Sequence, residues 1–272
     1  MRKKRVWWKQ KTLWAAGGAV AVLALIFSLI AFADFFQIYA IRVEGTKLIS
    51  AEKLRSKIDE FLSRKAGFAT TRSIFLVSKA DVRSRVLQEF PELAALSLDK
   101  TLPNTLFAVA QERIPSAVWC AASGGQCFLA DKEGIAYKEL DGNAFVEWSS
   151  QLPVLHDSLG ANSMKAGAKA IDAALLEALL KFRDGTSSVQ LAGGEALSFV
   201  SFDFLSAERV RAVAKEGWDA YINPEENLAW QSVKLKAVLE KKIPAESRRF
   251  LEYIDLRFGD QAYIKYKSNI KN

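Results

Sequence analysis

A histidine beside an aspartate is the pair in this sequence best suited to acid–base chemistry. His156 is the chain's one histidine, and Asp157 follows it directly. With a serine brought close by folding, such a pair could form an acyl-transfer triad. The sequence has no Gly-x-Ser-x-Gly turn, which carries the serine in one large class of hydrolases. We therefore predict that His156 and Asp157 are solvated neighbours in a loop, and that the protein is not an enzyme.

Two cysteines offer a second kind of chemistry. Cys120 and Cys127 bracket a short segment, with Trp119 before the first and Phe128 after the second. This layout predicts a hairpin whose cysteines face each other within disulfide range, and a compartment outside the cytoplasm would allow the bond to form. Two free thiols, or half of a metal site, are the alternatives. One histidine and two cysteines match no recognised zinc spacing, so we predict no metal and no cofactor.

The charge distribution bears on the class of partner. The chain has 272 residues, of which 38 are Lys or Arg and 31 are Asp or Glu. Six basic residues and no acidic one lie in the tail 1–11, which leaves 32 basic and 31 acidic residues elsewhere. A nucleic-acid-binding protein carries its basic patch on a folded domain, so this near balance argues against nucleic acid. No glycine-rich phosphate-binding motif occurs either, and we predict no small-molecule substrate.

A long apolar run follows the basic tail. From Thr12 to Ala33 there are 22 residues without a charge, and about 20 apolar residues suffice to cross a bilayer as a helix. We assign 12–36 to a membrane anchor. Because basic flanks stay in the cytoplasm, the N-terminus is expected inside and the bulk of the chain outside. A signal peptide cleaved after Ala31-Phe32-Ala33 is the alternative, although the run is longer than such signals usually have.

Beyond the anchor, the hydrophobic patterns predict an α+β fold in two domains. Residues 37–117 contain a strand, two helices and two further strands, in that order. The first of these helices shows a single apolar stripe, formed by Leu54, Ile58, Phe61 and Leu62. Residues 118–266 are expected to form a β-rich second domain of mixed α/β content with an antiparallel-rich sheet, and 267–272 a short tail.

Within the second domain, two segments have helical spacing of their apolar residues. They are 170–183 and 227–242, where Leu235, Val238 and Leu239 are expected to point inward. Residues 138–168 are expected to be a loop, ordered only around 152–155.

The last strand-like segment, 261–266, comes at the end of the chain. A terminal strand often lies at a sheet edge, where unpaired backbone groups can accept a strand of another chain. Lys265 and Lys267 would limit indiscriminate pairing there and attract an acidic partner. The alternative is that Tyr263 and Tyr266 are ordinary strand residues of the core or the surface.

The order of these elements and six short motifs resemble the FtsQ/DivIB family of bacterial cell-division proteins, whose first domain outside the membrane is a POTRA domain. The motifs follow one another along nearly the whole chain. They are Ile41-Arg42-Val43-Glu44-Gly45, Phe90-Pro91-Glu92-Leu93, Leu102-Pro103-Asn104-Thr105-Leu106 with Glu112-Arg113-Ile114-Pro115-Ser116-Ala117, Leu129-Ala130-Asp131-Lys132-Glu133-Gly134, Leu152-Pro153-Val154-Leu155 and Tyr253-Ile254-Asp255-Leu256-Arg257-Phe258.

The resemblance implies a non-enzymatic, single-pass scaffold in the bacterial cytoplasmic membrane, located at the division septum, that helps to control septal peptidoglycan synthesis. In the family, an FtsB subunit bound to FtsL docks by adding a strand to the C-terminal sheet edge. Phe258 matches an aromatic position of that partner site, and Arg257 precedes it. The docking strand implied by the resemblance consists of Tyr263, Ile264, Lys265 and Tyr266.

Two other functions stay open at this level. One is a membrane-tethered cell-wall hydrolase, which would need a cleft containing His156. The other is a POTRA-type chaperone for exported chains.

Overall fold

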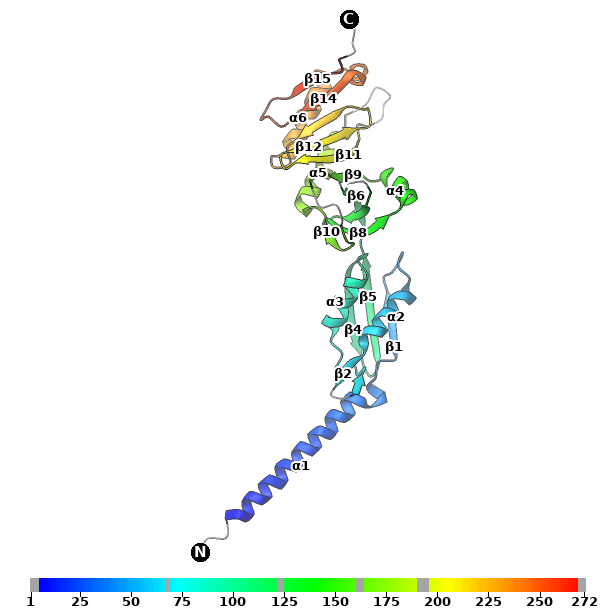
Figure 1. Ribbon diagram of the computed structural model, residues 1–272, viewed down its shortest axis with the longest axis vertical. Helices are drawn as coiled ribbons and strands as arrows, with labels where there is room; N and C mark the ends of the chain where they lie inside the picture. Colours follow the sequence, from blue (N-terminus) through cyan, green and yellow to red (C-terminus); the bar gives the residue numbers. More distant parts are fainter. Residues whose placement is uncertain (1–4, 67–68, 122–124, 160–163, 190–195, 269–272) are drawn as a thin grey trace. The chain divides into compact units, whose positions relative to one another are not determined.

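The computed structural model describes residues 5–66, 69–121, 125–159, 164–189 and 196–268. It divides into two compact units, Met1–Glu112 and Arg113–Asn272 (Figure 1). The fold class is α+β, as predicted, with one N-terminal apolar helix and a mixed sheet. The predicted boundary after Ala117 falls inside a strand of the second unit, because Pro115–Ala121 pairs with two strands of that unit.

The chain begins with the apolar helix α1, Arg5–Phe32, which a short 3-10 helix, η1 (Asp34–Phe36), follows. Within α1, Leu13–Phe32 is long and apolar enough to cross a membrane, with 20 residues and a mean hydropathy of 2.4. At a rise of about 1.5 Å per residue it spans roughly 30 Å, the thickness of a bilayer's hydrocarbon core.

The rest of the first unit is a small sheet covered by two helices. Its elements are β1 (Ala40–Glu44), α2 (Ala51–Leu62), β2 (Arg64–Ala66), β3 (Ala69–Thr71), α3 (Lys79–Glu89), β4 (Leu93–Thr101) and β5 (Thr105–Glu112). The sheet order is β1-β5-β4, with β1 parallel and β4 antiparallel to β5. The predicted strand–helix–helix–strand–strand order is present, and the hairpin β2–β3 adds to it.

Local chemistry explains where the elements of the first unit begin and end. Ser50 and Ser78 cap α2 and α3, since each side chain accepts a backbone N–H of the first turn. Gly45 ends β1 with φ +85°, and an added Cβ there would collide with the carbonyl of Ala110. The carboxylate of Glu112 accepts the N–H groups of 47–49, which ties the loop after β1 to the end of β5.

The second unit is built on a ten-stranded mixed sheet of order β10-β8-β7-β6-β9-β11-β12-β13-β14-β15. Its elements are β6 (Pro115–Ala121), β7 (Cys127–Asp131), β8 (Ile135–Leu140), α4 (Gly142–Ser149), β9 (Val154–Asp157), β10 (Ala168–Lys169), α5 (Ala173–Thr186), β11 (Phe199–Ser206), β12 (Arg209–Ala214), β13 (Asp219–Ile222), α6 (Leu228–Lys241), the 3-10 helix η2 (Ala245–Phe250), β14 (Leu251–Asp255) and β15 (Tyr263–Tyr266).

Helices pack on both faces of this sheet. One core cluster joins α5 and α6 to the inward residues of the strands, including Trp119 of β6. A smaller cluster joins Phe145 and Trp148 of α4 to Val118 and its neighbours. Because side chains alternate along a strand, Val118 and Trp119 point to opposite faces. The prediction that 138–168 is a loop is wrong for α4 and for the part of β8 it includes. The prediction that His156 and Asp157 lie in a loop is also wrong, because both belong to β9.

Candidate functional site

The strand β15 lies at one edge of the large sheet (Figure 1). It consists of the four residues of the predicted docking strand and pairs in antiparallel register with β14. On its other side, no strand from the described part of the chain pairs with it. The edge can therefore accept another extended segment through its backbone.

The side chains of β15 divide between the core and solvent. Ile264 packs against the main core cluster, whereas Tyr263 and Tyr266 are 52% and 42% exposed. Lys265 donates to Glu252 of β14 at 2.8 Å, and this hydrogen bond raises the pKa of Lys265. Lys265 thus carries a paired charge, and the two tyrosines supply the exposed ring surface of the edge.

The residues before the turn to β15 extend this aromatic surface. The ring of Phe258, 51% exposed, meets Tyr263 edge to face, with the ring centroids 5.4 Å apart. Arg257 donates to both carboxylate oxygens of Asp255, at 2.9 and 2.7 Å, and this bonding raises the pKa of Arg257. Phe258 therefore joins the exposed edge, and Arg257 already has an ionic partner within its own strand region.

A lysine that the sequence did not single out holds the turn between β14 and β15. The buried ammonium of Lys234, on α6, donates to the backbone carbonyls of Leu256, Gly259 and Gln261. Burial lowers the pKa of Lys234, although nearby carboxylates oppose this shift. Lys234 therefore fixes the turn that positions β15 against α6.

A groove of 540 Å³ runs between α6 and the start of β15. Its walls are the face of α6 that carries Trp230, Val233, Ala237 and Lys241, and the turn residues 260–262 with Tyr263, the first residue of β15. Trp230 donates to Asp260 at 3.0 Å, which ties the two walls together. The groove can bury a large apolar side chain next to a strand added at the edge.

The basic end of the groove lies where α6 stops. Lys241 and Lys242 line it, are exposed, and form no ion pair with any described residue. Their free charges suit an acidic partner. The sequence did contain a signal for this face, because Trp230, Val233 and Ala237 recur at helical spacing outside the inward stripe of α6.

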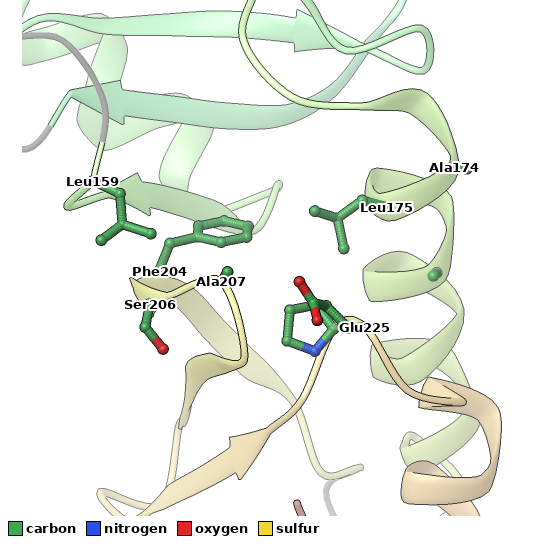
Figure 2. Close-up of a pocket in the computed structure, with 9 residues that line it drawn as sticks. Leu159, Ala174, Leu175, Phe204, Ser206, Ala207 and Glu225 are labelled. Carbon is green, nitrogen blue, oxygen red and sulfur yellow. The ribbon is translucent and has the colours of Figure 1, made fainter.

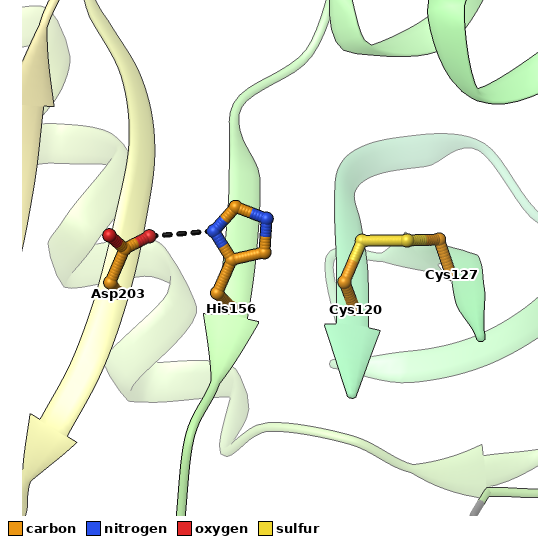
Figure 3. The surroundings of a disulfide bond; sticks show 4 residues. All are labelled: Cys120, Cys127, His156 and Asp203. Atoms are coloured by element: carbon orange, nitrogen blue, oxygen red, sulfur yellow. Dashed lines mark hydrogen bonds and ion pairs between the residues drawn. A yellow bond between two sulfur atoms is a disulfide. The ribbon is translucent and has the colours of Figure 1, made fainter. Parts of the chain in front are cut away.

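The cysteines and the histidine lie together (Figure 3). Their strands, β6, β7 and β9, are separated from β15 by four other strands of the sheet. A disulfide joins Cys120 and Cys127, which face each other across β6 and β7. His156 sits beside Cys120 in the parallel pair of β6 and β9. Its side-chain partner is Asp203 of β11, at 2.6 Å, and not its sequence neighbour Asp157.

The carboxylate of Asp203 belongs to an ionic network. Arg211 of β12 donates to it at 2.9 and 2.5 Å. Burial by itself raises the pKa of Asp203, but the hydrogen bonds from His156 and Arg211 outweigh burial and lower it. Within the described residues, no group of three or more His, Cys, Asp or Glu could hold a metal ion.

A second pocket, of 460 Å³, lies between α5 and the end of β11. Figure 2 shows Leu175 of α5 and Phe204 of β11 on opposite sides of it. Glu225 is the one charged residue among its lining residues in the described part of the chain. Its surface is apolar, and it shares no lining residue with β14 or β15.

Comparison with known proteins assigns the chain to no family. No family model matches it, and no curated protein matches it either. A function must therefore be inferred from the chemistry of the β15 edge and the α6 groove.

Proposed function

We propose that the protein is a membrane-anchored scaffold of the FtsQ/DivIB type, with a POTRA-like first unit, that recruits FtsB/FtsL-type partners and helps to control septal peptidoglycan synthesis. The observation that carries the proposal is the β15 edge beside the α6 groove. An edge strand supplies main-chain affinity, and a neighbouring groove supplies side-chain specificity.

The partner in this proposal is an extended acidic segment with one large apolar side chain. Its backbone pairs with β15, and alternate side chains then point to the same side of the sheet. The apolar side chain enters the groove next to Tyr263. Acidic residues of the partner lie near Lys241 and Lys242, the free cations of the groove.

The membrane topology in this proposal has the N-terminus in the cytoplasm and both units outside, in a bacterial inner membrane at the septum. The basic tail and the apolar length of α1 support it. The disulfide between Cys120 and Cys127 also fits an oxidising compartment.

A pull-down with an FtsB C-terminal peptide from the same organism tests the partner, using the full chain in detergent. Tyr263→Glu places a charge on the edge and groove and is expected to weaken binding roughly 30-fold or more, about 2 kcal/mol. Val146→Glu is the matched control, because Val146 is an exposed apolar residue on α4 of the same unit. Equal binding by both variants and the unmodified protein would place the partner site elsewhere.

The hydrolase alternative would use His156 with Asp203, a hydrogen-bonded pair. Among the described residues, no Ser, Thr or Cys side chain is hydrogen-bonded to the free nitrogen of His156. Normal division by cells that carry His156→Ala would discard this alternative. Loss of division with the fold intact would favour it over the scaffold.

A further inference from the structure

We propose that the end of the first unit next to α1 is a lipid-contacting surface that lies in the headgroup layer of the outer leaflet. We call it the juxtamembrane surface and define it by Phe35, Tyr39, Phe75 and Leu102. The inference rests on the membrane anchor of the proposed function, since without a bilayer this surface has no lipid to contact.

The last turn of α1 is bonded directly to the rest of the first unit, with no free linker between them. The four last carbonyls of a helix lack partners within the helix, and such groups are costly to leave unpaired near lipid. Ser73 donates to the carbonyl of Ile30 at 2.6 Å, and Thr71 donates to that of Ala31. Gln37 also donates to the carbonyl of Ala31, at 3.0 Å. The rest of the first unit therefore begins where the apolar span ends.

Three segments meet at this end of the unit. Backbone hydrogen bonds join 36–38 to 72–74, and they join Tyr39 to Asn104 in the turn between β4 and β5. The ring of Phe36 contacts both Phe35 and Phe75 edge to face, with centroids 5.1 and 5.2 Å apart. These contacts gather the residues of the juxtamembrane surface around the end of α1.

The residues of this surface expose apolar side chains that the unit's core does not cover. Their exposed fractions are 64% for Phe35, 64% for Tyr39, 50% for Phe75 and 62% for Leu102. In contrast, Ala31 in the last turn of α1 is fully buried against the unit. The end of α1 therefore packs directly against the rest of the unit.

The bilayer is the occupant that this position favours. The span Leu13–Phe32 fills the hydrocarbon core, and the headgroup layer extends about 5–7 Å beyond it on each side. Phe35 follows the end of the span by three residues, and aromatic rings concentrate at that depth. Asp34, the one charged residue of 33–39, is exposed and is tolerated in a hydrated headgroup layer.

The opposite end of the unit supplies a matched control. Leu48 is 83% exposed, and its N–H is bonded to the carboxylate of Glu112, which ends β5. Leu102 lies before the start of β5 at Thr105. Since β5 has eight residues, its ends are roughly 23 Å apart at about 3.3 Å per residue. A lipid contact made by the juxtamembrane surface is therefore out of reach for Leu48.

Depth measurements with a polarity-sensitive fluorophore on single cysteines test the proposal. Both native cysteines are in the disulfide, so an introduced thiol is the one free site. The full chain is reconstituted into vesicles of phosphatidylethanolamine and phosphatidylglycerol and labelled at Phe75→Cys, Leu102→Cys, Leu48→Cys or Ala21→Cys. Quenching by a nitroxide near the lipid headgroup is compared with quenching by aqueous iodide.

We expect the lipid nitroxide to quench the labels at Phe75 and Leu102 several-fold more than the label at Leu48, and iodide to show the reverse order. The label at Ala21, in the middle of the span, reports the anchor itself. If Ala21 lies in the bilayer while the labels at Phe75 and Leu102 match Leu48, the lipid surface is refuted and the anchor stands. If Ala21 is also exposed to iodide, both fail. Binding of the FtsB peptide at β15 is measured separately. If the unmodified protein does not bind the peptide, the partner proposal is refuted and the lipid surface is not affected.

Discussion

Replacing Lys234 by methionine tests whether this lysine holds the turn that positions β15. Methionine keeps the apolar stem of the side chain and removes the ammonium group. The carbonyls of Leu256, Gly259 and Gln261 then lose their donor. Lys236→Met, two residues along the same helix, is the matched control, because Lys236 is half-exposed and pairs with Glu240 at 3.8 Å.

The expected loss of stability follows from the three hydrogen bonds. A hydrogen bond from a charged donor contributes about 1.5–3 kcal/mol, and the third bond, at 3.5 Å, is weak. Burial lowers the pKa of Lys234, so removing the charge also removes a desolvation cost that offsets part of the loss. We expect Lys234→Met to lower the free energy of unfolding by about 2–4 kcal/mol. Lys236→Met should change it by about 0.5 kcal/mol or less.

Tryptophan fluorescence during urea unfolding measures this effect in the second unit. Residues 37–112 contain no tryptophan, whereas Trp119 and Trp218 are buried in the second unit. The shift of their emission therefore follows the unfolding of that unit. Binding of the FtsB peptide to each variant, under conditions where it is folded, gives a second readout.

Equal unfolding free energies for Lys234→Met and Lys236→Met would refute the role assigned to Lys234. A stable Lys234→Met variant that still binds the peptide with unchanged affinity would show that β15 is positioned without the hydrogen bonds of Lys234. The expected result is a folded variant with both lower stability and weaker peptide binding.

Three further perturbations test the other ionic and covalent contacts. Glu112→Gln should destabilise the first unit near pH 7. Burial raises the pKa of Glu112, but three backbone N–H groups outweigh it and lower the pKa. The difference from the unmodified protein should therefore shrink as the pH falls below about 4.3, the usual pKa of a glutamate, and vanish once the pH is below the lowered pKa; a difference that stays constant in thermal unfolding as the pH is lowered contradicts this. Replacing Cys120 and Cys127 together by serine should lower the unfolding free energy by about 2–2.5 kcal/mol in the chain-entropy model, and the same loss should follow when the unmodified protein is reduced. Asp203→Asn should cost about 1–3 kcal/mol in urea unfolding at neutral pH; because the pKa of Asp203 is lowered, this stability should also disappear in acid, and a neutral-pH curve identical to that of the unmodified protein would refute it.

Several local features follow from the sequence because their causes are local. The helix stripe of Leu54 and Ile58 faces the core of the first unit, and Ser78 caps α3. Cys120 and Cys127 face each other because a short hairpin brings close neighbours together. In each case a few adjacent residues and their periodicity suffice.

Among the elements of the second unit that were not predicted, α4 and β12 were missed for different physical reasons. The helix α4 has only eight residues, so its apolar periodicity extends over about two turns, and Asp141 as its cap was the other available signal. The strand β12 begins with arginine alternating with a small apolar residue and ends in Ala-Val-Ala, with every second residue buried. This is the pattern of a half-exposed strand. Because the strand has only six residues and starts three residues after β11 ends, the pattern is too short to be recognised in the sequence.

The pairing partners in the ionic networks could not be read from the chain. The sequence suggested Asp157 as the neighbour of His156, but the partner is Asp203, 47 positions away, because β9 and β11 lie side by side. Likewise, the contacts of Lys234 reach carbonyls 22 to 27 positions away. A period-2 pattern assigns side chains to a face of a strand but does not identify the adjacent strand.

The sequence alone determined the apolar N-terminal helix, the α+β class, the faces of the main helices and the extended segment near the end of the chain. The tertiary structure decided that this segment is the outermost strand of a ten-stranded sheet and that α6 runs beside it to form a groove. The physical reason is that hydrophobic periodicity is a local property, whereas a sheet edge and a groove depend on non-local strand pairing and helix packing.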